Sequence, residues 1–268
     1  MNWLSNRMKT NLSEKSNKGG LLARAFYERE GSTAARYNST SFWERRYHLR
    51  KASLVLTSLK LHLQPNFWIL DAGCGSGEMS IASKNLGGKV ISLDLSKSYL
   101  RRVYNKTDHL ICASTDCLPL KSGIFEIVLS TDVLEHICSY EESISEIHRV
   151  SKNLVIITTP CEGLLRRIFG CLFPDKLAEI DFQVGHLHII PLMELRKKLS
   201  KLGAVLYCRS FHVVQPLADR IIPARLEKII AFLEQVGDSL LPNQGTISFF
   251  VLKRVNTLAN ESLKLKKQ

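Results

Sequence analysis

Short β-rich runs that alternate with helical segments constrain the fold of this chain more than any other feature. The runs occupy residues 67–70, 89–94, 109–114, 125–130 and 154–159, and helical patterns separate most of them. Strands that alternate with helices pair in parallel, because each crossover returns the chain to the same edge of the sheet. The pattern therefore predicts an α/β fold with a doubly wound sheet.

An apolar, partly helical segment at residues 161–185 interrupts the alternation after the fifth run. The pattern then resumes with a helix at 191–202, a strand near 204–212, a helix at 223–236 and a strand at 246–253. These runs predict a mostly parallel, seven-stranded sheet with an insert after the fifth strand. We predict a helical, basic extension and lid over 1–63, a sheet domain over 64–254 with its insert or cap at 161–190, and a mobile basic tail over 255–268.

The positive charge of the chain lies at its two ends. The chain has 268 residues and a net charge of +12. Residues 1–60 carry 12 Lys and Arg against 4 Asp and Glu, residues 253–268 carry 5 against 1, and the middle carries 20 of each. Basic ends can contact RNA, anionic lipid or an acidic partner, or they can simply be solvated.

Composition excludes several classes of protein. Apolar residues make up 45% of the chain, which excludes wholesale disorder, and no apolar stretch reaches the roughly 18–20 residues of a membrane span. Residues 1–20 lack the apolar segment of a secretory signal. The seven cysteines form no Cys-x-x-Cys pair, which indicates reduced, buried thiols. We therefore expect a cytoplasmic protein, with peripheral contact to a membrane left open.

A glycine-rich segment follows the first strand. Residues 69–78 read Ile-Leu-Asp-Ala-Gly-Cys-Gly-Ser-Gly-Glu, so a strand ends in an acid and glycines alternate before a helix. Glycine allows positive φ and close approach of the backbone to a ligand. A dinucleotide fingerprint needs its third glycine at Glu78, which disfavours an NAD-dependent dehydrogenase. The pattern acid-x-Gly-x-Gly-x-Gly is met by Asp71, Gly73, Gly75 and Gly77.

This segment resembles motif I of the class I S-adenosylmethionine-dependent methyltransferases, of the methyltransferase type 11 kind. Further motifs follow in the family's order: Asp94 ends the second strand, residues 114–120 follow the third, and residues 125–136 end in Asp-Val-Leu-Glu-His. The resemblance runs continuously from about Phe67 to Pro160. Two departures are Glu126, where the family commonly has Asp, and 151–153, which replace a Pro-Gly-Gly turn. The resemblance implies a Rossmann-like methyltransferase domain.

The resemblance also implies that the cofactor is S-adenosylmethionine. We expect no metal at the site. In the family, the acid that ends the second strand binds the ribose hydroxyls. The acid after the third strand and the next backbone N–H hold the adenine. The cofactor-binding residues predicted in this way are Asp71, Gly73, Cys74, Gly75, Gly77, Asp94, Leu95, Asp116, Cys117 and Thr131.

Three histidines are candidates for a catalytic base. His136 follows the fourth strand, and His186 and His188 follow the insert, at positions that would share a face of an extended segment. An imidazole can accept the proton of an acceptor hydroxyl near neutral pH. The alternative is that His136 only caps or orients groups beside the cofactor and that the His186/His188 pair is structural. A metal site at the His-Leu-His pair lacks a third ligand at a recognisable spacing, and a nucleophilic role for Cys161 rests on a superficial match.

The acceptor class is constrained mainly by a motif that the chain lacks. Amino-methylating nucleic-acid enzymes usually carry Asn/Asp-Pro-Pro-aromatic after the fourth strand, where this chain has Ser-Thr-Asp-Val at 130–133. We expect transfer to oxygen of a small-molecule or lipid-like acceptor, beneath a lid formed by the Tyr27–Tyr47 region and the insert. Three alternatives stay open: basic termini that hold RNA or protein as the acceptor, a cofactor-binding protein without turnover, and an insert that only caps the domain.

Overall fold

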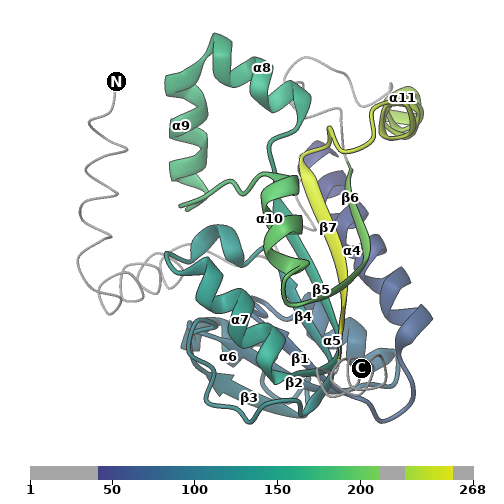
Figure 1. Cartoon of the computed structure of the whole chain (residues 1–268), viewed down its shortest axis with the longest axis vertical. Coiled ribbons are helices and arrows are strands. Elements are labelled where there is room, and N and C mark those ends of the chain that lie inside the picture. The colour runs from purple at the N-terminus through teal and green to yellow at the C-terminus, as the bar shows by residue number, and fades with distance from the viewer. Residues whose placement is uncertain (1–41, 212–226, 256–268) are drawn as a thin grey trace, which may run out of the picture.

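The computed structural model describes residues 42–211 and 227–255, which form one sheet covered by helices (Figure 1). The strands are β1 (Trp68–Ala72), β2 (Lys89–Asp94), β3 (His109–Cys112), β4 (Phe125–Thr131), β5 (Ser151–Pro160), β6 (Gly203–Phe211) and β7 (Ile247–Arg254). They lie in the order β3-β2-β1-β4-β5-β7-β6. β7 pairs antiparallel with β5 and β6, and the other pairs are parallel. The predicted seven-stranded, mostly parallel, doubly wound sheet is confirmed.

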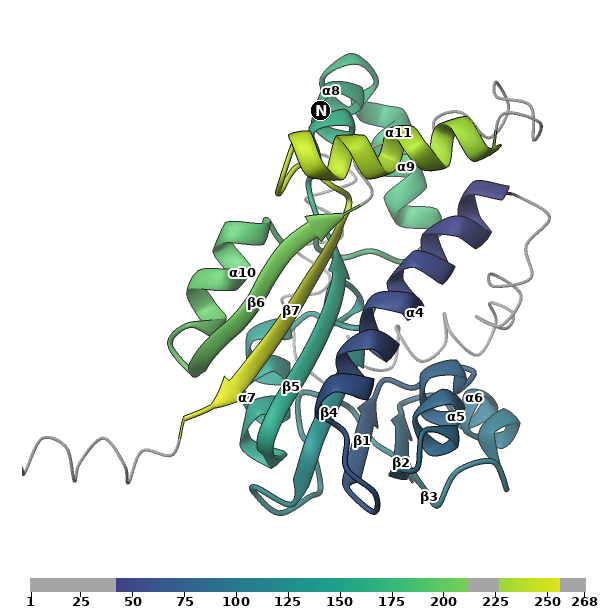
Figure 2. The same cartoon turned by 90° about the vertical axis from the view of Figure 1, so that its right-hand side faces the viewer.

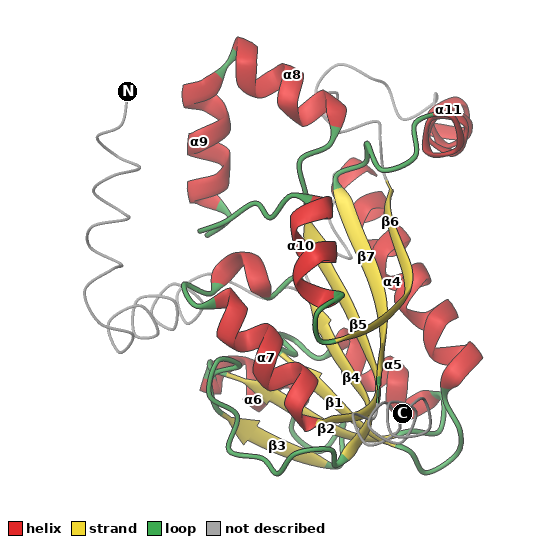
Figure 3. Cartoon of the chain, in the orientation of Figure 1, coloured by secondary structure: helices red, strands yellow, loops and turns green. Residues whose placement is uncertain are grey.

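Helices cover both faces of this sheet (Figures 2 and 3). They are α4 (Phe42–His62), α5 (Glu78–Asn85), α6 (Lys97–Val103), the short 3-10 helix η1 (Leu134–His136), α7 (Tyr140–Val150), α8 (Leu164–Leu172), α9 (Pro174–Gln183), α10 (Leu192–Leu199) and α11 (Glu227–Leu240). α4 and α5 pack on one face, where Leu59 and Met79 share a core with Ile69. α7 and α10 pack on the other face, where Ile147 and Leu195 join a second core.

The strand order reverses between β1 and β4, which lie side by side in the middle of the sheet. In doubly wound sheets, ligands bind at this reversal, beyond the carboxyl ends of the strands. Asp71 on β1 is level with Ser92 on β2 and with Leu129 on β4. The three strands therefore end at one edge of the sheet, where their following loops meet.

Helix α4 packs against the sheet. Ala52, Val55 and Leu59 are buried in the core beneath it. On its outer side, Arg50 Nη2 lies 3.3 Å from Asp238 Oδ2 on α11. The predicted division after residue 63 stays a prediction. Most of the predicted lid, including Tyr27, and the predicted tail from residue 256 onward lie outside the described residues.

The insert after β5 contains α8 and α9, which form a helical hairpin beyond the end of the sheet (Figure 1). Arg166 on α8 is buried, and it donates hydrogen bonds of 2.6 and 2.5 Å to both carboxylate oxygens of Asp181 on α9. Both contacts come from one guanidinium nitrogen, Nη2, and this charged pair joins the two helices. None of the helices in the described ranges is long and apolar enough to cross a membrane.

The cysteines are unpaired, as predicted, but they are not all buried. Cys74 and Cys161 are buried, whereas Cys112, Cys117 and Cys171 are exposed. The prediction of buried thiols is therefore wrong for these three. Cys112 ends the edge strand β3, Cys117 lies in a loop and Cys171 is in the hairpin beyond the sheet, so none of them has a second layer to cover it.

Candidate active site

Three glycines in the left-handed region shape the loop between β1 and α5. Gly73, Gly75 and Gly77 have φ values of 86°, 52° and 84°. The N–H of Gly73 donates to the carbonyl of Leu93 at 2.8 Å, which ties the loop to the end of β2. A Cβ atom at Gly73 would lie 2.4 Å from Cγ2 of Val133. This position therefore needs glycine both for its backbone conformation and for space.

Asp71 lies beneath this loop. Its carboxyl is fully buried, and Ser80 Oγ donates a hydrogen bond of 2.6 Å to its Oδ2. Ser80 Oγ accepts a hydrogen bond of 2.8 Å from Ser92 Oγ, so the acid joins β1, α5 and β2 in one network. Burial raises the pKa of Asp71 from 3.8 to about 7, and the Ser80 hydrogen bond opposes that rise.

Asp94 ends β2 and faces the glycine loop. Its Oδ2 accepts a hydrogen bond of 2.9 Å from the N–H of Gly75, and its Oδ1 accepts one of 2.8 Å from the N–H of Ser96. Each oxygen retains a further lone pair, so the carboxylate can still accept hydrogen bonds from the hydroxyl groups of a ligand. Burial raises the pKa of Asp94, and the backbone N–H groups counter part of that rise.

A cleft of about 1020 Å³, counting its open mouth, lies along the ends of β1, β2 and β4. The predicted residues that line it are Gly73, Cys74, Gly75, Asp94, Leu95, Thr131 and His136. Lining residues that we did not predict include His48, Lys51, Glu78, Thr115 and Asp132. Lys51 pairs with Asp132, and Glu78 and Asp94 add two further carboxylates to the lining, which favours a ligand that carries positive charge.

Four predicted cofactor residues lie outside this lining. Asp71 and Gly77 support the loop, and a Cβ at Gly77 would lie 2.6 Å from Val103 Cγ2. Asp116 is half-buried and Cys117 is exposed, and the same segment lines the cleft with residues 113–115 instead. Their contact with an adenine ring stays a prediction.

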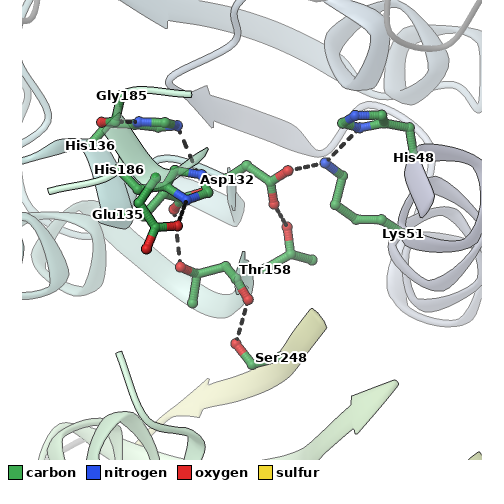
Figure 4. Close-up of polar contacts among 11 residues, drawn as sticks. His48, Lys51, Asp132, Glu135, His136, Thr158, Gly185, His186 and Ser248 are labelled. Atoms are coloured by element: carbon green, nitrogen blue, oxygen red, sulfur yellow. Dashed lines mark hydrogen bonds and ion pairs between the residues drawn. The ribbon is translucent and has the colours of Figure 1, made fainter. Parts of the chain in front are cut away.

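Asp132 stands at the centre of the site, directly after β4 (Figure 4). It has a φ of 54°, an uncommon backbone conformation for a residue other than glycine. Its Oδ1 accepts a hydrogen bond of 3.1 Å from Thr158 Oγ1, and its Oδ2 pairs with Lys51. Burial opposes ionisation of Asp132, but the Lys51 ammonium outweighs it and lowers the pKa of that carboxyl.

His48 lies beside Lys51 on α4. Its Nδ1 is 3.2 Å from Lys51 Nζ. An ammonium group only donates hydrogen bonds, so Nδ1 must accept and Nε2 must carry the proton. In that tautomer the ring can donate a hydrogen bond from Nε2. The sequence did not identify Lys51 as a site residue, because other basic residues surround it on the same helix.

A second cavity, of about 900 Å³ counting its mouth, adjoins the cleft. His48, Asp132 and His136 line both spaces. The other walls come from α4, η1, the end of β5, the insert and the turn before β7, and include Tyr47, Glu135, Cys161, Arg166, Ile180, Asp181, His186 and Thr246. The insert that we predicted as a lid thus contributes side chains to a cavity beside the cofactor cleft.

Glu135 is buried in the wall of the second cavity. Thr159 Oγ1 donates a hydrogen bond of 3.0 Å to its Oε2, and its backbone carbonyl accepts one of 2.7 Å from the N–H of Leu187. The second bond ties the loop after the insert to η1. Burial raises the pKa of Glu135 well above its usual range, and the charge of Asp132 adds to that rise.

The three histidine candidates have different surroundings. The rings of His136 and His186 lie 5.1 Å apart between centroids, and both line the second cavity. The ring of His188 lies 5.3 Å from that of Tyr140, and it lines neither space. The expectation that His186 and His188 share a face is wrong, because the segment is a loop and not a strand.

Two further groups in the second cavity are protonated at neutral pH. Burial raises the pKa of Tyr47 well above its usual value, and the charges of Asp132 and Glu135 act in the same direction. Burial raises the pKa of Cys161 to about 12, and its Sγ donates to the carbonyl of Gly245 at 3.1 Å. A thiol held in this form is a poor nucleophile, which counts against covalent catalysis through Cys161.

Known proteins resemble this chain in sequence and in fold. A family model described as a methyltransferase domain matches residues 70–157. An uncharacterized protein of Methanocaldococcus jannaschii is 31% identical over 205 residues, which cover 73% of this chain and 81% of that protein. A malonyl-[acyl-carrier protein] O-methyltransferase of Buchnera aphidicola is 34% identical over 148 residues, which cover 54% of this chain and 56% of that protein.

The fold comparison points the same way. Magnesium protoporphyrin IX methyltransferase from Synechocystis PCC 6803, crystallised with bound S-adenosylmethionine, aligns with a TM-score of 0.58 at 14% identity, covering 88% of this chain and 97% of that one. The chain belongs to the class I S-adenosylmethionine-dependent methyltransferases. Its cofactor is S-adenosylmethionine, and the positive-φ glycines, the Asp94 carboxylate and the acidic cleft fit a nucleoside that carries a sulfonium charge.

Proposed function

We propose that this chain transfers the methyl group of S-adenosylmethionine to an oxygen atom of a small-molecule or lipid-like acceptor, bound in the second cavity. The observation that carries the proposal is the shared wall formed by His48, Asp132 and His136. A molecule in the second cavity lies against the cofactor cleft, as direct transfer requires.

The cleft supports the cofactor contacts that the resemblance implies. Asp94 has lone pairs left for the ribose hydroxyls, and the glycine loop lets the backbone approach the ligand. Asp116 and Cys117 remain the proposed adenine contacts. Lys51 lines the cleft, and its pairing with Asp132 positions it there.

The reaction supplied by the bound cofactor is a displacement, in which the acceptor oxygen bonds to the methyl carbon and the electron pair of the broken S–C bond returns to sulfur. A hydroxyl acceptor must also lose its proton. His136 and His186 line the acceptor cavity and are the groups that we propose assist this loss. His136 Nδ1 donates to the Gly185 carbonyl at 2.9 Å, so Nε2 is the nitrogen with a lone pair.

The second cavity favours an acceptor with apolar and oxygen-bearing parts. Ile180 and Val184 offer apolar contact, and Tyr47 offers a hydroxyl. Arg166 is already paired with Asp181, so the cavity wall is not strongly basic. The relative in Buchnera aphidicola is named for methyl transfer to oxygen of malonyl-[acyl-carrier protein], which supports an oxygen acceptor in this chain as well.

Label transfer from methyl-labelled S-adenosylmethionine tests the proposal. The full chain is incubated with an extract fractionated into small molecules, lipids, RNA and protein, and with malonyl thioesters and phenols as defined acceptors. We expect label in the small-molecule or lipid pool. The labelled methyl group should be released from the product by treatments that cleave an ether or an ester. Label confined to RNA or to protein side chains would overturn the acceptor class, and cofactor binding without any transfer would overturn the activity.

A further inference from the structure

A buried carboxylate and two imidazoles meet on the wall of the acceptor cavity (Figure 4). Glu135, His136 and His186 each offer one ligand atom, and these three atoms lie within 4.8 Å of one another. We propose that they bind a divalent transition-metal ion, with Zn²⁺ as the ion that this donor set fits best. The inference rests on the proposed function, because it gives the same cavity a means of holding the acceptor oxygen. A bound ion would occupy the lone pairs of His136 and His186, so it would replace their proposed role as proton acceptors.

The types of donor favour this class of ion. Two imidazole nitrogens and one carboxylate oxygen form a ligand set found at catalytic zinc sites, which keep a position open for water or substrate. Mg²⁺ and Ca²⁺ prefer oxygen ligands throughout, so they fit less well. The expectation of a chain without a metal considered only His186 and His188. The fold instead brings His186 to the Glu135–His136 pair.

His136 already has the orientation and the tautomer of a metal ligand. Its Nδ1 donates to the Gly185 carbonyl at 2.9 Å, so the lone pair is on Nε2. That nitrogen lies 3.8 Å from Glu135 Oε1. Metal-binding histidines commonly donate their other ring N–H to a carbonyl or carboxylate, which fixes the ring and raises its basicity.

Glu135 supplies the second line of evidence. The side chain is completely buried, and Thr159 bonds to its Oε2. Its Oε1 has no hydrogen-bond partner among the described residues. An unsatisfied buried oxygen is costly unless a ligand or ion occupies it. On the far side of the cluster, His186 Nδ1 lies 3.6 Å from Asp181 Oδ1, which can orient that ring in the same way.

The ion pairs around the cluster do not neutralise Glu135. Asp132 is paired with Lys51, and Asp181 is paired with Arg166. These pairs cancel locally, whereas the ion-pair partner of an ionised Glu135 is His136, which carries a charge only when it is protonated. A divalent ion would supply that charge.

Binding requires a small movement. Donor atoms around a tetrahedral Zn²⁺ with bonds of about 2.0–2.1 Å are roughly 3.3 Å apart, so the three side chains must draw together by about 1.5 Å. His186 lies in the loop after α9, whose backbone is held by the Leu187–Glu135 hydrogen bond, so the movement falls mainly to its side chain. The remaining positions on the ion would face the cavity. An acceptor hydroxyl bound there would ionise more readily, with its proton passing to water.

Metal titration of the full chain tests this inference without reference to activity. Protein stripped with EDTA is titrated with Co²⁺, followed by visible absorption, and with Zn²⁺, followed by calorimetry. We expect one ion to bind per chain. Its affinity should fall at least about tenfold in His186→Ala and in Glu135→Gln, since even changes outside the ligand shell lower metal affinity by that factor. His62→Ala, which removes an exposed imidazole at the end of α4, should bind as the unaltered chain does.

Folding and cysteine binding are controlled in the same experiment. Circular dichroism melting identifies any variant that fails to fold, and Glu135→Gln keeps the size and the Thr159 contact. An intense near-ultraviolet charge-transfer band would show that thiolates hold the ion and would overturn the site. Absence of stoichiometric binding, or equal affinity in folded His186→Ala, would also overturn it. If methyl transfer persists in the stripped protein under those outcomes, the proposed function stands and only the metal site fails.

Discussion

The proposed cofactor cleft and the second cavity, which we propose holds the acceptor, share a wall, yet they are built in different ways. The cleft is formed by loops at the ends of β1, β2 and β4, and its shape depends on backbone conformation at positions such as Gly73. The cavity is formed by side chains from segments far apart along the chain, from Tyr47 on α4 to Thr246 before β7. The cleft is therefore a property of the sheet, whereas the cavity is a property of how helices and insert pack on it.

This difference predicts different responses to mutation. A change in the cleft should displace the backbone and abolish cofactor binding. A change in the cavity should alter the acceptor step and leave the cofactor bound. A change at Lys51, which lines the cleft and pairs with Asp132 of the shared wall, should affect stability and both steps.

Gly73→Ala should give the largest effect, and it acts on the cleft. The new Cβ would lie 2.4 Å from Val133 Cγ2, at a φ of 86° that disfavours alanine. Displacing the loop would disturb the Gly75–Asp94 hydrogen bond and the ligand contacts beside it, so we expect affinity for S-adenosylmethionine to fall roughly 100-fold. Isothermal titration calorimetry measures this loss.

Gly87→Ala is the matched control for that variant. Gly87 has a φ of 96°, but nothing lies within 4 Å of an added Cβ. It should therefore lose about 1 kcal/mol of stability from backbone strain and retain cofactor binding. Equal loss of binding in both variants would show that strain, and not the contact with Val133, decides the result. The double variant Gly73→Ala/Val133→Ala should recover part of the affinity.

Asp71→Asn tests whether the loop depends on a protonated acid. Burial raises the pKa of Asp71 from 3.8 to about 7 in the folded protein. Between these values the folded state retains a proton that the unfolded state loses, so its stabilising contribution is present at low pH and disappears as pH rises through about 7. Between pH 5 and pH 8 the free energy of unfolding of the variant should therefore rise by about 3 kcal/mol relative to that of the unaltered chain. Urea unfolding at several pH values measures the difference.

Asp108→Asn should change relative stability with pH in the opposite direction. The pKa of Asp108 is lowered: burial tends to raise it, but hydrogen bonds from the Val90 N–H and from Lys84 prevail. Its contribution to stability is present above its unfolded pKa and is lost as pH falls. Asp108→Asn should therefore become relatively less stable as pH rises. Parallel slopes for the two variants would contradict the assignment of Asp71.

The contrast between the two spaces also explains what sequence alone could predict. Sheet order, the glycine loop and Asp94 follow from local patterns, because strand–loop–helix units place these residues by their own geometry. Lys51 could not be distinguished from a solvated basic residue until α4 was seen to pack on the sheet. The meeting of Glu135 with His186 depends on the path of the insert, and no spacing in the sequence encodes that path.

Lys51→Met tests the shared wall. Lys51 and Asp132 are an ion pair in which the lysine side chain is only 6% exposed. Removal of one partner leaves a carboxylate without its charge partner, so we expect a loss of about 3 kcal/mol in the free energy of unfolding. The double variant Lys51→Met/Asp132→Asn should recover much of that loss. Additive losses in this double-mutant cycle, measured by chemical denaturation, would show that the pair contributes no coupling.

His186→Ala acts on the second cavity alone, and its effect on cofactor binding should be the smallest of those predicted here. His186 lines the acceptor cavity but not the cofactor cleft. We expect turnover to fall about 100-fold, because either a proton acceptor or a metal ligand is lost. Affinity for S-adenosylmethionine should stay within about twofold, as for sites without shared contacts. Steady-state kinetics with calorimetry on the same preparation separates the two quantities. A parallel fall in cofactor affinity would mean that the cleft and the cavity act as one site, and that their different construction has no functional consequence.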